Sequence, residues 1–315
     1  MGEPVGIGPE VTAKAWLAGA PPFCVLGDAA LYAGVPVARV ASIEEAAAAF
    51  GHALPVLHRP LPAPATPGVL EPRNAPAVIA AIAEAVALAQ AGRAGAVVTC
   101  PIQKSVLTAA GFPHPGHTEF LGELAGTGVP PVMMLACPEL RVVPVTVHEP
   151  LARAIARLTP ELIAEHARIT HAALVRDFGI AQPRLAVAGL NPHAGEAGTL
   201  GHEDQAIVAP AVALLRAEGI LATGPHPPDT LFTALARPTY DAAICLYHDQ
   251  ALIPLKTLDM EGGVNVTLGL SVIRTSPDHG TALDIAGRGI ASPHSLLAAL
   301  RLADQLLRTR PCASR

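Results

Sequence analysis

Short apolar runs alternate with segments of helical periodicity along most of the chain. Residues 74–91 place apolar side chains at helical spacing, with Asn74 in position to cap the start and Gly92 just past the end. Residues 94–99 follow at once as an apolar run of the kind that forms a buried strand. Alternation of strands and helices is typical of βα units, so we expect an α/β protein with a largely parallel sheet.

The rest of the chain extends this pattern. A helix is predicted after Thr159, which stands before Pro160 and an acidic first turn, and Gly179 closes that helix. Residues 55–72 are rich in proline and have no periodicity, which indicates a surface loop. The further elements that we expect are strands at 184–190, 241–246 and 264–274, a helix at 203–218 and a last helix from Ser292.

Three histidines each stand just past the end of an apolar run, namely His148, His193 and His248. Open α/β sheets build ligand sites at the carboxyl ends of their strands. Three neutral imidazoles that meet there would form a catalytic metal site with open coordination positions. The alternative is that each is a loop histidine bonded to backbone or water.

Three more polar residues follow His248 at spacings of eight, nine and nine residues: Lys256, Asn265 and Arg274. A lysine, an amide and a guanidinium together suit a phosphate or a carboxylate, although each is also an ordinary surface residue type. Arg274 ends a predicted apolar strand, where an enclosed guanidinium needs a partner. Asp229, in a proline-rich run, is either a helix cap or a general base.

Two other segments also allow two interpretations each. Thr118 can cap the helix that follows it, whereas His117 beside a helix N-terminus can meet an anionic group. Lys104 follows another predicted strand, where a solvated surface lysine is the plain alternative. The segment that contains Gly6 and Gly8 is not a dinucleotide fingerprint, because it has no third glycine and no strand precedes it in this chain.

Composition narrows the class of protein. At 315 residues the chain is long for one hydrophobic core, so two lobes are expected. A formal charge of -5 without a basic run argues against nucleic acid as a partner. No apolar stretch reaches the roughly 18 residues of a membrane helix, and the first residues have no signal-peptide pattern. The five cysteines form no CxxC pair, which argues against a disulfide framework or a thiolate zinc site and favours the cytoplasm.

Seven segments of the chain read, in order, GEPVGIGPE, GHTEFL, VTVHEPL, GLNPHAGE, PPDTLF, YHDQALIPLK and GGVNVTLGLSVIRTSPDHGTALDIAGRG. Together they resemble the 4-hydroxythreonine-4-phosphate dehydrogenases of pyridoxal phosphate biosynthesis. The resemblance runs from the first residues to about Gly289, and GLNPHAGE, YHDQ and IRTSPDHGTA are its most specific parts.

The resemblance implies a fold like that of isopropylmalate and isocitrate dehydrogenases, a two-lobed α/β/α sandwich with the active-site cleft between the lobes. Residues 1–115 and 262–315 would form the cofactor-side lobe, and residues 116–261 the metal and dimerisation lobe. The family places a β-strand before its first loop, and Met1 already lies inside that loop. Either translation begins upstream or this protein tolerates the loss of that strand.

The resemblance also implies a set of site residues. The metal ligands would be His148, His193 and His248, holding zinc, cobalt or magnesium in a site shared across a homodimer. The implied substrate contacts are His117, Thr118, Lys256, Asn265 and Arg274. The segment HGTALDIAGRG is similar to the adenine-side loop of the superfamily, which implies NAD or NADP at His279, Gly280 and Asp284. Asp229 is the candidate proton acceptor.

The implied reaction oxidises the alcohol of 4-phosphohydroxy-L-threonine, a small phosphorylated substrate. Its product is a 2-amino-3-oxo acid that decarboxylates to 3-amino-2-oxopropyl phosphate. The alternatives are a related dehydrogenase of a phosphorylated four-carbon hydroxy acid or a cis-diol, a catalytically silent metabolite-binding protein, and a structural zinc protein. The run Thr99–Lys104 departs from the usual family pattern, which bears on the choice of substrate.

Overall fold

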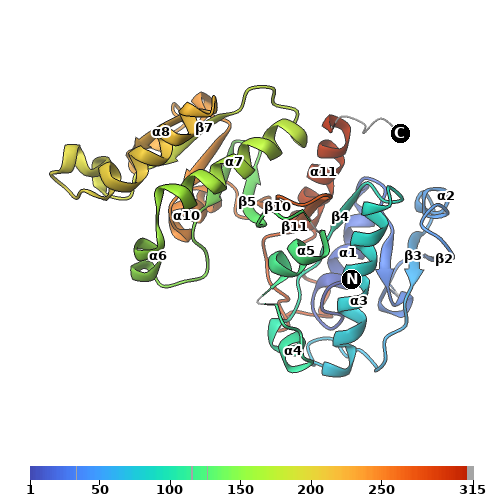
Figure 1. Cartoon of the computed structure of the whole chain (residues 1–315). Coiled ribbons are helices and arrows are strands. Elements are labelled where there is room, and N and C mark those ends of the chain that lie inside the picture. The colour runs from blue at the N-terminus through green and yellow to red at the C-terminus, as the bar shows by residue number, and fades with distance from the viewer. Residues whose placement is uncertain (33, 115, 126, 311–315) are drawn as a thin grey trace. The chain divides into compact units, whose positions relative to one another are not determined.

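The computed structural model describes residues 1–32, 34–114, 116–125 and 127–310 (Figure 1). The chain forms two compact units, each assembled from separate stretches of sequence. The first unit comprises Met1–Pro131 and Leu270–Leu307, and the second comprises Val132–Gly269 and Arg308–Arg315. Both units contain β-strands and α-helices in alternation, as the hydrophobic pattern predicts. In the described part of the chain, no helix is both long and apolar enough to cross a membrane.

The first unit contains two groups of parallel strands. Its strands are β1 (Val25–Gly27), β2 (Val37–Val40), β3 (Leu54–His58), β4 (Ala96–Val98) and β11 (Ile273–Pro277). Strand β3 lies between β1 and β2, and β11 pairs with β4. The helices are α1 (Gly8–Leu17), α2 (Ala46–Phe50), α3 (Ala75–Gln90), α4 (Lys104–Ala109), α5 (His117–Ala125) and α11 (His294–Thr309).

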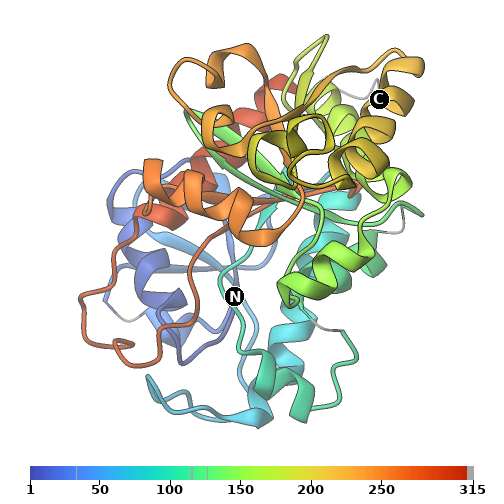
Figure 2. The same ribbon diagram turned by 90° about the vertical axis from the view of Figure 1, so that its left-hand side faces the viewer.

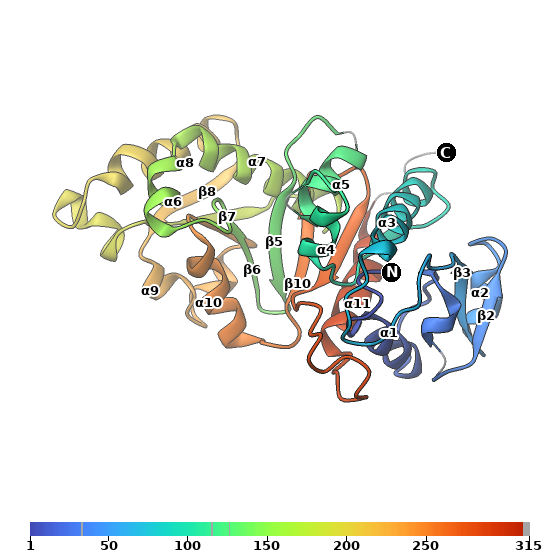
Figure 3. The ribbon, with the colours of Figure 1, turned by 90° about the horizontal axis from the view of Figure 1, so that it is seen from below.

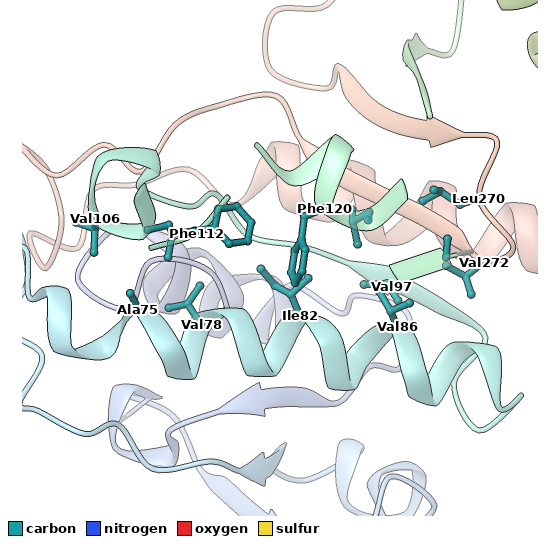
Figure 4. Packing of buried hydrophobic residues seen from close by; sticks show 13 residues of the cluster. Ala75, Val78, Ile82, Val86, Val97, Val106, Phe112, Phe120, Leu270 and Val272 are labelled. Atoms are coloured by element: carbon teal, nitrogen blue, oxygen red, sulfur yellow. The ribbon is translucent and has the colours of Figure 1, made fainter. Parts of the chain in front are cut away.

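A core beneath α3 holds much of the first unit together. Figure 4 shows Val78, Ile82 and Val86 along one side of this helix, with Phe120 of α5 packed against them. Their spacing of four residues keeps them on one helical face. Ile82 is 3% exposed, so its replacement by alanine is expected to destabilise the fold by about 2–5 kcal/mol. This core fixes α5, the helix that begins at His117.

The second unit contributes six neighbouring strands of an eight-stranded sheet, in the order β10-β5-β6-β9-β7-β8. Its strands are β5 (Val132–Cys137), β6 (Leu140–Pro144), β7 (Arg184–Ala188), β8 (Leu221–His226), β9 (Ala242–Cys245) and β10 (Val264–Leu268). Strands β6, β9, β7 and β8 run parallel, whereas β5 is antiparallel to both of its neighbours. The carboxyl ends of the four parallel strands therefore meet at one edge of the sheet.

Helices cover both faces of this sheet. They are α6 (Leu151–Arg157), α7 (Pro160–Arg176), α8 (Ala209–Ala217), α9 (Pro228–Leu231) and α10 (His248–Leu258), with a π-helical turn at Asp204–Val208. Figure 3 shows α7 and α8 on one side of the strands and α10 on the other.

Several predicted elements are confirmed. Helix α7 begins at Pro160, and the Oγ1 atom of Thr159 accepts a hydrogen bond from the Leu162 N–H at 3.1 Å, as expected of an N-cap. Strands β7 and β9 lie within the runs predicted for them. Helix α3 spans all but the ends of its predicted range.

Other predictions are wrong for identifiable reasons. The expected strand at 264–274 is two strands, because Gly269 adopts a φ of 80° and breaks the run between β10 and β11. Asn74 does not cap α3, because its Oδ1 atom instead accepts the Ala63 N–H at 3.0 Å. The expected loop at 55–72 begins too early, since Pro55 lies within the central strand β3.

Candidate active site

The three strand-exit histidines follow neighbouring parallel strands of the second unit. His148 comes after β6, His248 after β9 and His193 after β7, and β9 lies between the other two strands. The sheet order therefore brings the three loops to the same edge, which the sequence alone does not specify. His148 and His193 are exposed and His248 is half-buried, so each can be reached by a ligand.

Two of these imidazoles lie side by side. The ring centroids of His148 and His248 are 5.7 Å apart, with 45° between the ring planes. Two imidazole nitrogens about 2.0–2.1 Å from one ion allow a centroid spacing of this size. The Nδ1 atom of His248 lies 2.7 Å from Asp249 Oδ1, which leaves its Nε2 atom for a ligand. This pair therefore fits two positions of a divalent metal ion.

The third histidine is not brought into such a group. Among the described residues, no three histidine, cysteine, aspartate or glutamate side chains are placed to hold a metal ion together. His193 lies instead in a left-handed turn, residues 193–197, in which every φ is positive. The three-histidine site of the sequence analysis thus stays a prediction.

Backbone strain marks the same two loops. His148 has a φ of 50° and His193 a φ of 52°, in the left-handed region that residues other than glycine rarely adopt. Such a conformation costs on the order of 1–3 kcal/mol and concentrates at functional sites. The strain supports a ligand-binding role for both histidines over the interpretation as ordinary loop residues.

The other predicted residues of the second unit lie on separate elements. Asp229 is in the first turn of α9, which packs against the segment Pro192–Gly198 that contains His193. Lys256 is half-buried on α10. The Oδ1 atom of Asn265, on β10, is buried with no hydrogen-bond partner among the described residues. An acceptor enclosed in this way is suited to a donor on a bound molecule.

In the first unit, Arg274 is buried rather than at the end of a long strand. It is the second residue of β11 and is 2% exposed, and its Nη2 atom donates a hydrogen bond to Thr99 Oγ1 at 2.6 Å. Burial alone lowers the pKa of this guanidinium to about 10. It remains charged at neutral pH, so an anion beside it would be bound strongly.

His117 lies close enough to Arg274 and Lys104 to feel their positive charges. We call Lys104, His117 and Arg274 together the cationic cluster. Burial, and then the charges of Arg274, the Met1 amino group and Lys104, hold the pKa of His117 well below its usual range. Its Nε2 atom is buried without a hydrogen-bond partner in the described chain. His117 and Thr118 are the first two residues of α5, so Thr118 lies in the first turn and does not precede the helix as a cap. The backbone N–H groups at the N-terminus of a helix add to the attraction for an anion.

The expected cofactor loop contacts the start of the chain. The Ile7 N–H donates to the Thr281 carbonyl at 3.0 Å, and a Cβ atom on Gly6 would lie 2.8 Å from that carbonyl oxygen. Gly6 therefore permits close packing of two backbones, which accounts for glycine at this position without a dinucleotide fingerprint. Figure 2 shows the loop that follows β11 lying beside α1.

Within that loop the predicted cofactor residues are accessible to different degrees. The Nδ1 atom of His279 lies 3.0 Å from the Gly280 carbonyl, and its Nε2 atom is buried without a partner among the described residues. Gly280 and Asp284 are exposed. Glu10 and Lys14 of α1 hold the end of the loop through hydrogen bonds to the backbone of Gly289 and Ala291.

A cavity of about 330 Å³ lies elsewhere in the first unit. It is lined by residues of β1, β4 and α11 and by none of the predicted site residues. Of the five cysteines, Cys24, Cys100, Cys137 and Cys245 are free thiols, and Cys312 lies outside the described residues.

Sequence reasoning missed several residues that shape these sites. Glu3 is 4% exposed, and burial raises the pKa of its carboxyl group, although nothing in its sequence context marks it as buried. Thr99 lies in the run Thr99–Lys104 noted above, but its hydrogen bond from Arg274 could not be foreseen from the sequence. Thr146 stands two residues before His148, and Gln250 stands two residues after His248. This closeness in sequence to candidate histidines is the signal by which both could have been found.

The chain is similar to characterised families over nearly its full length. The family model of "Pyridoxal phosphate biosynthetic protein PdxA" matches residues 19–303. A 4-hydroxythreonine-4-phosphate dehydrogenase of Bradyrhizobium diazoefficiens is 55% identical, covering 97% of this chain and 95% of the relative.

Two solved structures add to this comparison. A 4-hydroxythreonine-4-phosphate dehydrogenase from Klebsiella pneumoniae aligns with a TM-score of 0.88 at 37% identity and covers 98% of both chains. A terephthalate 1,2-cis-dihydrodiol dehydrogenase from Burkholderia xenovorans aligns with a TM-score of 0.67 at 32% identity, covering 97% of this chain and 96% of the other. The predicted α/β fold class of the isocitrate and isopropylmalate dehydrogenases is confirmed by these similarities.

Proposed function

The chain belongs to the family of the pyridoxal phosphate biosynthetic protein PdxA, and on that premise we propose that it oxidises 4-phosphohydroxy-L-threonine with a nicotinamide cofactor. The alcohol loses a hydride to the cofactor and a proton to a base, which gives a 2-amino-3-oxo acid. Loss of carbon dioxide then yields 3-amino-2-oxopropyl phosphate, because the new carbonyl accepts the electrons of the broken bond.

The observation that supports this substrate best is the cationic cluster of the first unit. Arg274 is buried and charged, and Lys104 and the first turn of α5 add positive potential around His117. An anion beside a buried charge of this kind is attracted to it and offsets part of its loss of hydration. The phosphate or the carboxylate of the substrate is such an anion.

His117 and Thr118 are proposed to bind the same anionic group. Because the pKa of His117 is lowered, its imidazole stays neutral and can donate one hydrogen bond from Nε2 without adding a charge. The Thr118 hydroxyl and the N–H groups of the first turn of α5 supply further donors. These groups orient the substrate by several hydrogen bonds at once.

The second unit is proposed to act on the alcohol. Two of its histidines, His148 and His248, lie at a spacing suited to a divalent metal, and His193 would complete the set. Such a metal, when bound, lowers the pKa of an alcohol that it coordinates. Imidazole ligands favour zinc or cobalt over magnesium. Asp229, on the helix that packs against the His193 segment, is the proposed proton acceptor.

Lys256 and Asn265 are proposed to bind the remaining polar groups of the substrate. The buried Oδ1 atom of Asn265 accepts a hydrogen bond and so suits an ammonium or hydroxyl group. The Lys256 ammonium suits a phosphate or a carboxylate.

The cofactor is proposed to bind along the loop after β11, at His279, Gly280 and Asp284. A nicotinamide supplies the hydride acceptor. The exposed carboxylate of Asp284 favours NAD over NADP, because it would repel the extra phosphate of NADP.

A homodimer is proposed as the active form. Several large apolar side chains of the second unit are exposed, among them Leu235 at 90%, Ile253 at 63% and Met260 at 72%. Exposed apolar groups of this size mark surfaces that associate, and a second copy of the same chain is the commonest partner. A site shared by two copies would also be consistent with an incomplete set of metal ligands in one chain.

The similarity to a cis-dihydrodiol dehydrogenase favours one second candidate, oxidation of a cis-diol. Initial rates with NAD or NADP separate the two functions. We expect turnover of 4-phosphohydroxy-L-threonine and at least about 30-fold lower kcat/KM for 4-hydroxy-L-threonine, since the loss of a bound anion from a charged site is worth about 2–5 kcal/mol. Equal turnover of phosphorylated and unphosphorylated substrates, with faster turnover of a cis-diol, would contradict the proposal.

A further inference from the structure

The loop between β11 and α11 is fastened near its end by two charged residues of α1. We propose that Glu10 and Lys14 are positioning residues that hold this loop in the conformation that binds the nicotinamide cofactor and thereby set the affinity for it. This inference rests on the proposed function of the loop. Both residues would act through the backbone of the loop and not through contact with the cofactor.

Glu10 and Lys14 stand one helical turn apart and form an ion pair of 2.8 Å. The Lys14 Nζ atom also donates to the Gly289 carbonyl at 2.9 Å and to the Ala291 carbonyl at 2.7 Å. The Glu10 carboxylate accepts the Gly289 N–H at 3.2 Å and the Ala291 N–H at 2.8 Å. The pair therefore binds the N–H and the carbonyl of both loop residues, and we call this set of bonds the clamp.

The charge of Glu10 strengthens the clamp. Burial alone would raise the pKa of its carboxyl group, but the hydrogen bonds from Lys14, Ala291 and Gly289 outweigh burial and hold this pKa below its usual value. Glu10 is therefore ionised at neutral pH, and a charged acceptor forms stronger hydrogen bonds than a neutral one. The side chains of Glu10 and Lys14 are 15% and 32% exposed, so water screens the clamp only in part.

The first part of the loop is held by other contacts. The Thr281 carbonyl accepts the Ile7 N–H at 3.0 Å, and the Thr281 Oγ1 atom donates to Gln103 Oε1 at 3.0 Å. Three side chains of the loop also pack into an apolar core of the first unit, namely Ala282, Ile285 and Ala286. These contacts fix the loop as far as Ala286, and the residues after it depend on the clamp.

Residues 287–290 have few contacts of their own. All four are exposed, and Gly287 and Gly289 adopt φ angles of 75° and 72°. The Arg288 N–H donates to the Ile285 carbonyl at 3.2 Å, and Gly287 lies against Pro67. Glycine loses more conformational freedom on ordering than any other residue, so this stretch needs outside contacts to keep one conformation.

The predicted cofactor residues lie on the same loop and fit a ligand. The buried Nε2 atom of His279 has no hydrogen-bond partner among the described residues, and a Cβ atom on Gly280 would meet nothing within 4 Å. The exposed Asp284 carboxylate suits hydroxyl groups such as those of a ribose. A loop that is already ordered binds more tightly, because binding does not have to supply the free energy of ordering it.

Matched variants of the full-length protein test this inference. Lys14→Met removes the ammonium group at similar length, and Lys14→Arg keeps a charged donor. Glu10→Gln keeps the shape and replaces one acceptor oxygen by a donor. Arg59→Met is the control, because Arg59 also pairs with a carboxylate, that of Glu84, and also donates to a backbone carbonyl, that of His58, at 2.9 Å.

The first readout is the dissociation constant of NADH, measured from its fluorescence in the absence of substrate. If loss of the clamp lowers the fraction of ordered loop to about one tenth, Lys14→Met and Glu10→Gln should weaken NADH binding by about 10-fold. Lys14→Arg and Arg59→Met should stay within about 3-fold of the unmodified protein. In turnover, the KM for NAD should rise in the first two variants, while kcat and the KM for 4-phosphohydroxy-L-threonine stay nearly constant.

The second readout is the rate of trypsin cleavage after the exposed residue Arg288, located by mass spectrometry. Cleavage should be faster in Lys14→Met and Glu10→Gln than in Arg59→Met, because the loop opens more often. NADH should slow this cleavage in the unmodified protein. The two Lys14 variants keep the test valid if Glu10→Gln does not fold.

The possible failures are distinguishable. If Lys14→Met and Glu10→Gln bind NADH as tightly as Arg59→Met does, the positioning role is wrong and the proposed oxidation stands. If kcat and both KM values change together with the melting temperature, the clamp is a general stabilising contact, and the inference is also wrong. If the unmodified protein binds neither NADH nor NADPH, the proposed function is wrong, and the positioning role falls with it.

Discussion

Replacement of Arg274 by methionine separates a binding role from a structural one. Arg274 is almost completely buried, and its Nη2 atom donates to Thr99 Oγ1. Methionine has a similar length and no charge. If Arg274 serves an anionic ligand, the variant should keep its stability and lose its catalytic efficiency.

The expected change in stability follows from two opposing contributions. Burial lowers the pKa of Arg274 from 12.5 to about 10, and at 1.36 kcal/mol per pKa unit its charge destabilises the fold by about 3 kcal/mol. The hydrogen bond to Thr99 is one of the interactions that offset this cost, and a bond from a charged donor usually contributes about 1.5–3 kcal/mol. Since the cost and the interactions oppose each other, the free energy of unfolding should change by no more than about 1–2 kcal/mol.

The expected change in activity is much larger. Truncation of one partner of a buried, hydrogen-bonded charge pair typically costs about 2–5 kcal/mol, or about 30- to 5,000-fold in kcat/KM. Urea unfolding and initial rates on the same preparations measure both quantities. Arg141→Met is the control, because Arg141 is half-buried, donates to the Asp241 carbonyl at 3.1 Å and lies outside both candidate sites.

The control should lose stability and retain its kcat/KM. The reasoning would be refuted if Arg274→Met unfolded at least 3 kcal/mol more easily while its kcat/KM stayed within about 3-fold of the unmodified protein. Arg274 would then be a structural residue of β11.

Three further predictions concern pH, metal and backbone strain. Because burial, followed by the neighbouring positive charges, lowers the pKa of His117, its contribution to stability is fully present above about pH 6.5 and declines as the pH falls below that value. Between pH 8 and pH 5.5, His117→Gln should therefore lose less unfolding free energy than the unmodified protein, and equal losses in urea titrations would contradict this. Removal of divalent metal with a chelator should abolish turnover and lower the melting temperature, and Co²⁺ or Zn²⁺ at about 100 times its Kd should restore about 2.7 kcal/mol of stability. Turnover that persists in chelator would refute a catalytic metal. In metal-free protein His148→Gly should be about 1 kcal/mol more stable than His148→Ala, because glycine adopts a φ of 50° without strain, and neither variant should bind Co²⁺ tightly. Equal stability of the two variants would mean that the loop relaxes on substitution.

The local pattern was sufficient to predict individual elements and strand exits. Helix α7 could be predicted with its cap because Thr159 and Pro160 act on their immediate neighbours. The positions of His148, His193 and His248 after strands could also be predicted, since an apolar run precedes each of them.

Features that depend on tertiary pairing could not be predicted in the same way. The proximity of His148 and His248 depends on β9 lying beside β6, and these strands are about 100 residues apart in the chain. The burial of Arg274 depends on the break between β10 and β11 at Gly269. The residues on both sides of Gly269 are apolar, so the sequence reads as one continuous strand. The left-handed turn at His193 begins with two residues other than glycine, His193 and Ala194. The usual sequence indication of positive φ angles, a glycine, is therefore absent where the turn begins.

The central claim is tested most directly by the products formed from 4-phosphohydroxy-L-threonine. The purified chain is incubated with this substrate and NAD or NADP, and reduced cofactor and carbon dioxide are measured together. The account predicts equal amounts of both, formed only when divalent metal is present. Substrate binding without any reduced cofactor, in the presence of zinc, cobalt or magnesium, would contradict it and identify a metabolite-binding protein instead.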